Sequence, residues 1–194
     1  MLTDGMNYLW PTPVLKDSIK DQDLLNELIS ELFTLYDLQN PPSDILQDNI
    51  FESGSKIIER FKTEVVLPAF AKFLKESFDL DLANYPHSYL RGWVAGYSPG
   101  YFMINHNHSG SHMTGVFYLL VEDGKGGELT MEDPRVNANR GYLLEMMPKF
   151  KSNVYSPKSG EFAIFPSFLY HYVNPFQGQC RLAIPVDFNL ADKE

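Results

Sequence analysis

Residues 103–121 read MINHNHSGSHMTGVFYLLV, and this stretch decides the fold. It ends in a run of apolar, aromatic and β-branched residues, Met113–Val121, that is typical of a buried β-strand. It also holds three of the five histidines of the chain, His106, His108 and His112. Since alternate residues of a strand point to the same face, His106 and His108 can converge on one point. Two imidazoles on one face of a barrel strand supply half of a metal site.

Further strand-like segments flank this stretch on both sides. They are short, rich in aromatic and β-branched residues, and bounded by Gly, Pro and Asn. In chain order they are Tyr89–Tyr97, Glu128–Met131, Glu161–Phe165 and Arg181–Phe188. Such a series of short strands predicts a mainly β fold, either a barrel or a sandwich.

Before residue 85 the apolar period is helical instead, which predicts helices that buttress the barrel on one side. Asp21 is a suitable N-cap for the first helix, and Pro68 predicts a kink or break in a second helix from about Phe51 to Phe78. The apolar face of the first helix consists of Leu25, Leu28, Ile29, Leu32 and Tyr36. We expect one domain over residues 1–194, with helical support over about 1–85 and the barrel over about 86–190.

The chain is acidic, with 16 Lys and Arg against 25 Asp and Glu and a formal charge of −9. This balance argues against broad binding to nucleic acid or to an anionic membrane surface, because both depend on cationic side chains. A single cysteine, Cys180, excludes an internal disulfide framework and a Cys-rich zinc site. There is no signal-peptide pattern and no run of about 18 apolar residues, so we expect a cytoplasmic protein.

A third metal ligand has to come from elsewhere in the fold. His171 is the natural candidate because it is expected at the end of an apolar strand, within Phe165–His171. Ten residues later, Arg181 opens a strand in which its neighbours on the same face are Ala183 and Pro185. The planar fork of an arginine in such a place suits bidentate capture of a carboxylate.

Each of these residues also has a plainer interpretation. A histidine in an aromatic segment is often a hydrogen-bonded structural residue, and Arg181 can be an exposed charge on an edge strand. His87 stands beside Pro86 and is expected to be structural or exposed. His112 can contact substrate, support a metal ligand, or take no part in the site.

Taken in order, the motifs resemble the Fe(II)- and 2-oxoglutarate-dependent dioxygenases, in their prolyl-4-hydroxylase-like branch. The similarity is greatest to the small oxygenases of phages and bacteria, which carry H-x-H before a similar strand and an EDPR-like segment. The resemblance covers roughly residues 88–190. It is carried by Tyr97-Ser-Pro-Gly, His106-Asn-His108, Thr114–Leu120, Gly126-Gly-Glu-Leu, Glu132–Arg135, Ser156–Phe165, His171 and Arg181. For a phage protein the expected location is the host cytoplasm.

The resemblance implies a double-stranded β-helix, a jelly-roll or cupin-like barrel with N-terminal buttressing helices. It implies that His106 and His171 bind Fe(II) and that Arg181 and Tyr118 hold the C5 carboxylate of the co-substrate 2-oxoglutarate. The implied reaction uses O₂ to hydroxylate a C–H bond, with succinate and CO₂ as co-products, and a peptidyl proline is one implied substrate. Residues expected around the substrate are Trp93, Tyr101, Phe117, Arg135 and Tyr170.

Position 108 departs from the family pattern. The common motif is H-x-D, which gives the two histidines and one carboxylate of non-haem Fe(II) oxygenases. Here the aspartate position is His108. We expect His108 to be the third metal ligand; the alternative is that His108 stands off and that Glu132 or a water completes the site.

Two other functions fit the same residues. One is a cupin-type dioxygenase that uses three histidines and no 2-oxoglutarate, and the other is a non-enzymatic β-barrel that binds a partner or a sugar. Arg181 distinguishes the first of these from a 2-oxoglutarate enzyme, since only the latter needs a carboxylate clamp. The motifs identify neither the substrate nor the oligomeric state.

Overall fold

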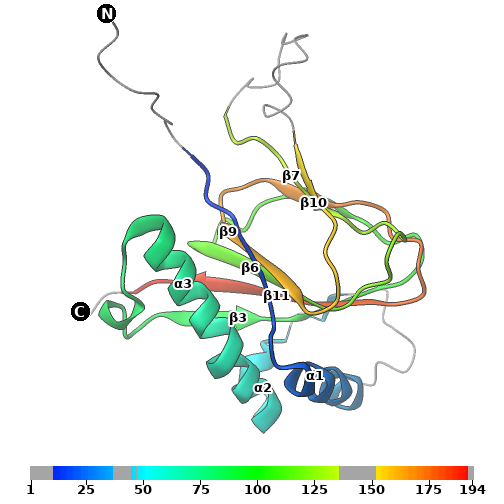
Figure 1. Cartoon of the computed structure of the whole chain (residues 1–194), viewed down its shortest axis with the longest axis horizontal. Coiled ribbons are helices and arrows are strands. Elements are labelled where there is room, and N and C mark those ends of the chain that lie inside the picture. The colour runs from blue at the N-terminus through cyan, green and yellow to red at the C-terminus, as the bar shows by residue number, and fades with distance from the viewer. Residues whose placement is uncertain (1–10, 37–44, 47, 136–151, 192–194) are drawn as a thin grey trace, which may run out of the picture.

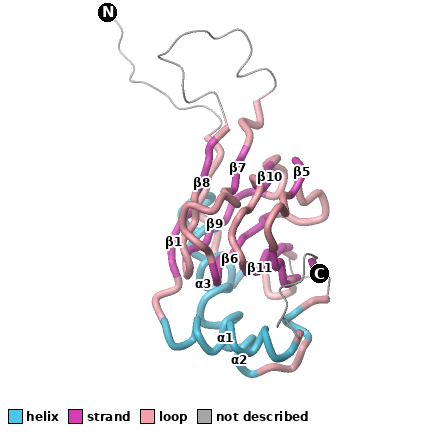
Figure 2. The backbone as a smooth tube through the Cα atoms, turned by 90° about the vertical axis from the view of Figure 1, so that its right-hand side faces the viewer, coloured by secondary structure: helices cyan, strands magenta, loops and turns pink. Residues whose placement is uncertain are grey.

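The computed structural model describes residues 11–36, 45–46, 48–135 and 152–191, which form three layers (Figure 1). Helices form one outer layer, a seven-stranded sheet lies in the middle, and a four-stranded sheet forms the other outer layer, as Figure 2 shows. The two facing antiparallel sheets confirm the expected jelly-roll barrel with helical support on one side.

The middle sheet has the order β1-β9-β6-β11-β4-β2, and β3 also pairs with β11. Its central strand, β11, pairs with β6 along one edge and with β3 and β4 along the other. The strands of this sheet are β1 (Leu15–Ser18), β2 (Ile45–Leu46), β3 (Tyr89–Gly92), β4 (Val94–Tyr97), β6 (Met113–Leu120), β9 (Glu161–Pro166) and β11 (Arg181–Asn189).

The smaller sheet has the order β5-β10-β7-β8. Its strands are β5 (Met103–His106), β7 (Leu129–Met131), β8 (Asn153–Tyr155) and β10 (His171–Val173). The predicted segment Glu128–Met131 contains β7, and the strand expected to carry His106 is β5. The other two strands, β8 and β10, are not among the predicted segments; each has three residues, too few to show an apolar alternation.

The helices lie where the apolar period places them. Asp21 caps α1 (Gln22–Leu35) by accepting a hydrogen bond from the Leu24 amide, at 2.9 Å. The second predicted helix is a continuous run of α2 (Lys56–Phe61), a π-helical turn (Lys62–Val66) and α3 (Leu67–Phe78). Short 3₁₀ turns lie at Ile50–Glu52 and Leu82–Asn84. Pro68 has no amide hydrogen, so the ladder of helical hydrogen bonds is rearranged just before it and the helix is not broken.

One predicted strand is two strands in the structure. Tyr89–Tyr97 divides at Trp93 into β3 and β4, which pair with different halves of β11. At the division, the Trp93 amide donates to the Pro185 carbonyl at 3.1 Å, while Pro185 has no amide hydrogen to return. The proline therefore marks a local interruption of the sheet.

The two faces of β11 have opposite characters, and this alternation organises the molecule. Even-numbered residues from Leu182 to Phe188 pack into the apolar core shared with the helices. The odd-numbered residues Arg181, Ala183 and Pro185 line a cavity between the two sheets. A strand with period two thus separates the layer that stabilises the fold from the layer that can hold a ligand.

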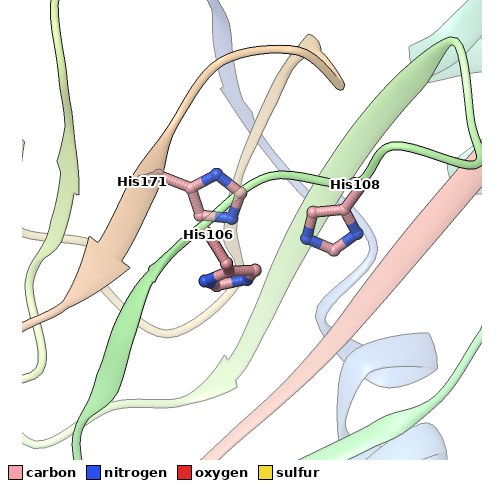
Figure 3. Close-up of side chains that lie close together, drawn as sticks. All are labelled: His106, His108 and His171. Atoms are coloured by element: carbon pink, nitrogen blue, oxygen red, sulfur yellow. The ribbon is translucent and has the colours of Figure 1, made fainter.

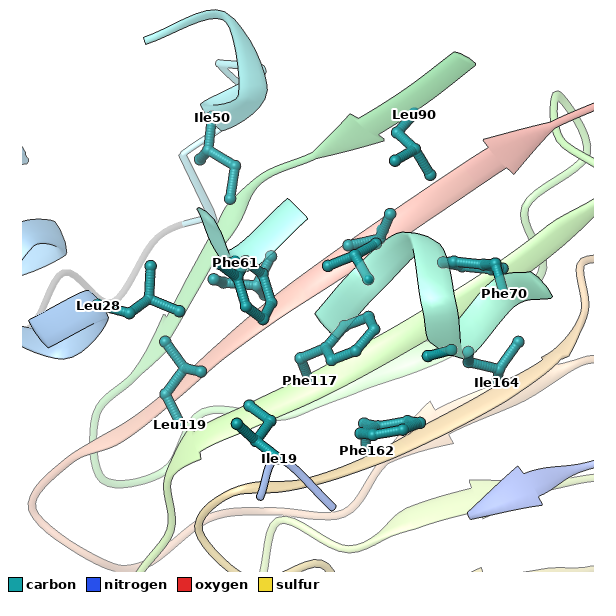
Figure 4. Close-up of a cluster of buried hydrophobic side chains, with 14 of the residues drawn as sticks. Ile19, Leu28, Ile50, Phe61, Phe70, Leu90, Phe117, Leu119, Phe162 and Ile164 are labelled. Atoms are coloured by element: carbon teal, nitrogen blue, oxygen red, sulfur yellow. The ribbon is translucent and has the colours of Figure 1, made fainter. Parts of the chain in front are cut away.

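The main core lies between the helices and the middle sheet (Figure 4). Phe117 on β6 is fully buried there and meets Phe61 edge to face, with ring centroids 5.4 Å apart. Phe70 on α3 stacks on Phe188 of β11 at 4.9 Å. Phe117, expected at the substrate pocket, is therefore part of this core, because it lies on the helix-facing side of β6.

None of the helices in the described ranges is both long enough and apolar enough to cross a membrane. The last helical turn ends at Asn84 and β3 begins at Tyr89, but two earlier strands, β1 and β2, also belong to the middle sheet.

Truncation of Phe117 tests the helix–sheet core. We expect Phe117→Ala to lower the free energy of unfolding by about 3–5 kcal/mol, because the aromatic contacts are lost and a cavity remains. Leu35→Ala, at a side chain that is 44% exposed, should change it by less than about 0.5 kcal/mol. Urea unfolding of the three proteins measures both values, and equal effects of the two substitutions would contradict the assigned core.

Candidate metal and co-substrate site

Three histidines converge between the two sheets (Figure 3). His106 ends β5 and His171 begins β10, and the two residues are directly paired across these antiparallel strands. His108 follows in the loop after β5. One potential ligand nitrogen from each ring lies within 4.8 Å of those from the other two, as a shared metal ion requires.

The structure corrects two details of how these side chains are positioned. His108 lies beyond the end of β5, so the two-residue period of a strand does not bring it to the site. Its loop is held instead by a hydrogen bond from the His108 amide to the Ser167 carbonyl, at 3.0 Å. His171 likewise begins a strand, β10, because the apolar stretch before it turns after Pro166.

Hydrogen bonds fix the tautomers of all three rings. The Nδ1 atoms of His106 and His171 donate to the backbone carbonyls of Ile104 and Leu169, at 2.8 and 2.9 Å. The Nδ1 atom of His108 donates to the Asp187 carboxylate at 2.8 Å. Because these partners only accept hydrogen bonds, each Nδ1 carries the proton and each Nε2 keeps a free lone pair.

Burial favours the neutral form of two of the rings, those of His171 and His106. His171 is 3% exposed, and desolvation lowers its pKa to about 4, against the opposing hydrogen bond to the Leu169 carbonyl. Desolvation also lowers the pKa of His106. Imidazole nitrogens bind Fe(II) as well as Zn, Cu and Ni, so the donor set is compatible with the iron expected there.

A buried cationic pocket lies at the other end of the cavity. Arg181 is 1% exposed, and its Nε and Nη1 atoms have no hydrogen-bond partner among the described residues. The hydroxyl of Tyr118, also fully buried, has none either. Its burial raises the pKa of Tyr118, so the phenol stays protonated and able to donate. Buried donors without partners suit a ligand carboxylate, because its oxygens can accept their hydrogen bonds.

The guanidinium of Arg181 is held by its surroundings. It lies over the rings of Tyr97 and Tyr118, 4.5 and 5.1 Å from their centroids. Gly127, at φ +77°, leaves room for its stem: a Cβ there would approach Arg181 Cδ to 3.1 Å. The Gly-Gly element of the sequence motif therefore has a packing role next to the arginine.

A single cavity joins the histidines to this pocket, and it is mainly apolar. Trp93 lines it, and its ring stacks on His108 with centroids 5.8 Å apart. The remaining lining side chains are Tyr97, Met103, Val116, Leu129, Val173, Ala183 and Pro185. The sequence pattern does not separate these residues from the helix-facing core.

Three other residues expected at the substrate do not line this cavity. Tyr101 stacks on Tyr97 at 4.2 Å, so Tyr97 stands between it and the cavity. Tyr170 is 50% exposed. The exposed side chain of Arg135 binds Asp133, with Nε 2.9 Å from Oδ1, because the turn places the two residues together.

The structure also shows the contacts of the residues whose roles the sequence leaves open. Glu132 is exposed and accepts a hydrogen bond from Asn105 at 3.0 Å, outside the histidine cluster. His112 uses its Nδ1 to accept from the Leu190 amide at 3.1 Å, which is a structural role. The carboxylate in contact with the cluster is that of Asp187, which the sequence analysis does not single out. The signal that could have found it is its odd-numbered position on β11, which places it on the same face of the strand as Arg181.

Comparison with known proteins establishes the family. Residues 91–189, about half of the chain, match the family described as "Putative 2OG-Fe(II) oxygenase". The chain therefore belongs to the Fe(II)- and 2-oxoglutarate-dependent oxygenases, and it is an oxidoreductase that uses Fe(II), 2-oxoglutarate and O₂. A search of curated proteins finds no match.

Solved structures share the fold. A Pseudomonas putida prolyl-4-hydroxylase is 17% identical, with a TM-score of 0.62 over 91% of this chain and 87% of that one. A Trichoplax adhaerens prolyl hydroxylase, solved with a hypoxia inducible factor peptide, is 16% identical, with a TM-score of 0.62 over 92% and 83%. The epimerase SnoN from nogalamycin biosynthesis, solved with Fe³⁺, α-ketoglutarate and nogalamycin RO, is 13% identical, with a TM-score of 0.63 over 92% and 78%.

The low pKa of His171 predicts a pH dependence of stability. Because the folded-state pKa is about 4 and the unfolded one about 6.5, the unfolded chain binds more protons between these values, so stability falls as the pH drops through that range. We expect the metal-free protein to lose about 3 kcal/mol there through His171. The stability difference between wild type and His171→Gln, followed by urea unfolding from pH 7 to 4, should shift by that amount. A constant difference would contradict this prediction.

Replacing Arg181 separates binding from stability. We expect Arg181→Met to weaken 2-oxoglutarate binding at least about 100-fold, because the far carboxylate loses two charge-assisted hydrogen bonds. The metal-free variant should be at least as stable as wild type, since a buried guanidinium with two unsatisfied nitrogens is removed. Calorimetry with 2-oxoglutarate on Co(II)-loaded protein measures the first effect, and urea unfolding the second. Arg60→Met, at an exposed arginine of α2, is the matched control and should leave the affinity unchanged.

Proposed function

We propose that this oxygenase hydroxylates a C–H bond of a prolyl residue in a peptide or protein substrate. The observation that carries the catalytic part of the proposal is the pairing, within one cavity, of a three-histidine cluster with the unpartnered donors of Arg181 and Tyr118. A site for a metal alone needs no buried cation at its far end, so this pairing favours a 2-oxoglutarate enzyme over a cupin-type dioxygenase.

The residues of the chain have separate tasks in this proposal. His106, His108 and His171 hold Fe(II) through their Nε2 atoms, and their Nδ1 bonds keep the rings oriented. Arg181 and Tyr118 bind the C5 carboxylate of 2-oxoglutarate and so direct its 2-oxo acid end toward the histidines. The bound iron, with 2-oxoglutarate and O₂, supplies the oxidising chemistry, and succinate and CO₂ are the co-products.

The apolar lining supports the substrate class. Trp93 and Pro185 line the cavity on the side of the middle sheet, and Trp93 stacks on His108. The indole of Trp93 gives the cavity an aromatic wall beside the metal ligands, and aromatic side chains also line the grooves that bind proline-rich peptides. The prolyl hydroxylases among the structural relatives agree with this choice.

A turnover assay tests the proposal. Metal-free protein is reconstituted with Fe(II) and 2-oxoglutarate under nitrogen, exposed to air, and assayed for succinate with and without proline-containing peptides. We expect slow succinate formation without peptide, faster formation with a proline peptide, and a mass gain of one oxygen on that peptide. The matched peptide with Ala in place of Pro should give neither effect.

The outcomes separate the two parts of the proposal. If no succinate forms with wild type under any condition, the 2-oxoglutarate mechanism is wrong. If succinate forms and is abolished by His106→Ala, but no proline peptide gains oxygen, the cofactor assignment stands and the substrate class is wrong.

A further inference from the structure

We infer that Asp187 is the carboxylate of this metal centre, acting through His108 and not as a ligand of its own. The inference rests on the proposed metal site and adds a positioning residue to it. In the common H-x-D arrangement a carboxylate binds the metal directly, whereas here a histidine takes that place and a carboxylate stands behind the histidine.

Geometry makes this contact specific. Asp187 Oδ1 lies 2.8 Å from His108 Nδ1, with side chains that are 18% and 11% exposed. The alternation of β11 turns Asp187 toward the interior of the barrel, on the same face as Pro185 and Arg181. In this orientation the carboxylate reaches the Nδ1 side of the ring, which leaves Nε2 free to face the other two histidines.

A chain of hydroxyl groups holds the carboxylate in place. Thr114 Oγ1 donates to Asp187 Oδ1 at 3.0 Å, and Ser167 Oγ is 3.0 Å from Thr114 Oγ1. Ser111 Oγ continues the chain, 2.7 Å from Ser167 Oγ. Thr114 and Ser167 are 0% and 1% exposed, so this polar network is buried and its members are satisfied by one another.

The same network also holds the loop that carries His108. Ser167 accepts the His108 amide with its carbonyl, at 3.0 Å, and donates its own amide to the His112 carbonyl at 3.1 Å. Ser167 lies in the turn that leads to His171, so one turn helps to position two of the three histidines. The ring of His108 is further packed against Trp93 and His171, at centroid distances of 5.8 and 5.2 Å.

The three histidines differ in the charge of the group to which each Nδ1 donates. His106 and His171 donate to neutral backbone carbonyls, and His108 alone donates to a carboxylate. A carboxylate partner makes an imidazole a stronger metal donor and places a negative charge near the cation. Compared with the common H-x-D motif, this site lacks a carboxylate at position 108, and Asp187 supplies a negative charge next to that position.

Metal binding without 2-oxoglutarate tests the inference independently of activity. We expect Asp187→Asn to weaken Co(II) binding by 10- to 100-fold in calorimetry at pH 7.5, and to shift the ligand-field absorption bands of the Co(II) complex. Thr114→Val, which keeps the carboxylate but removes its anchoring hydroxyl, should give a smaller loss. Glu76→Gln, at an exposed carboxylate on α3, removes the same charge far from the site and should leave affinity and spectrum unchanged.

A double-mutant cycle decides whether Asp187 acts through His108. In a His108→Ala background, Asp187→Asn should have no further effect on Co(II) affinity, because the ring that transmits the effect is gone. A full additional loss in that background would mean that Asp187 binds the metal directly and would overturn the inference. An Asp187→Asn protein with wild-type affinity would overturn it as well.

Two further results keep the outcomes distinct. If wild type binds no Co(II), the proposed metal site and this inference both fail, whereas binding by wild type with no effect of Asp187→Asn removes the inference alone. If Asp187→Asn does not fold, proton NMR of Zn(II)-loaded wild type provides the test. One histidine Nδ1 proton, assigned by its loss in His108→Ala, should lie clearly downfield of the other two, and three equivalent shifts would contradict the carboxylate bond.

Discussion

The two-residue period of β11 is the constraint on which the rest of the structure depends. Its even positions are apolar and pack against the helices. Its odd positions include Arg181, in the buried cationic pocket, and Asp187, which accepts a hydrogen bond from His108. Because β11 is the central strand of the middle sheet, its neighbours β6, β3 and β4 are fixed relative to the same two faces. Fold stability and site chemistry are thus divided between the sides of one strand.

The cavity combines rigid polar ends with an apolar middle. At one end, backbone carbonyls and a carboxylate hold three imidazoles in a single tautomer; at the other, tyrosine rings and a glycine cradle the guanidinium. Contacts within the chain itself hold the side chains at both ends in place. Preorganised donors of this kind are what binding and catalytic sites generally use.

The order of motifs along the sequence was sufficient to predict the fold and the family, and it singled out three histidines that the structure brings together. The facing of individual side chains was not predictable in the same way. Met113–Leu120 is almost continuously apolar, so nothing in it distinguishes Phe117, in the helix core, from Val116, in the cavity. Asp187 resembles an ordinary solvent-facing strand residue until its partner is known, and His108 reaches the cluster through a loop whose path depends on Ser167.

A strand that carries both charges also limits how the chain can vary. About 20 Å of extended backbone separates Arg181 from Asp187. A slip of one residue in the register of β11 would turn both charged side chains into the core between the helices and the middle sheet, and would turn Leu182 and Phe188 out of that core. A single-residue insertion between Arg181 and Asp187 would place their side chains on opposite faces of the sheet. Between Arg181 and Asp187 the chain can therefore accept substitutions but not insertions or deletions, because the same register places both the site and the core side chains.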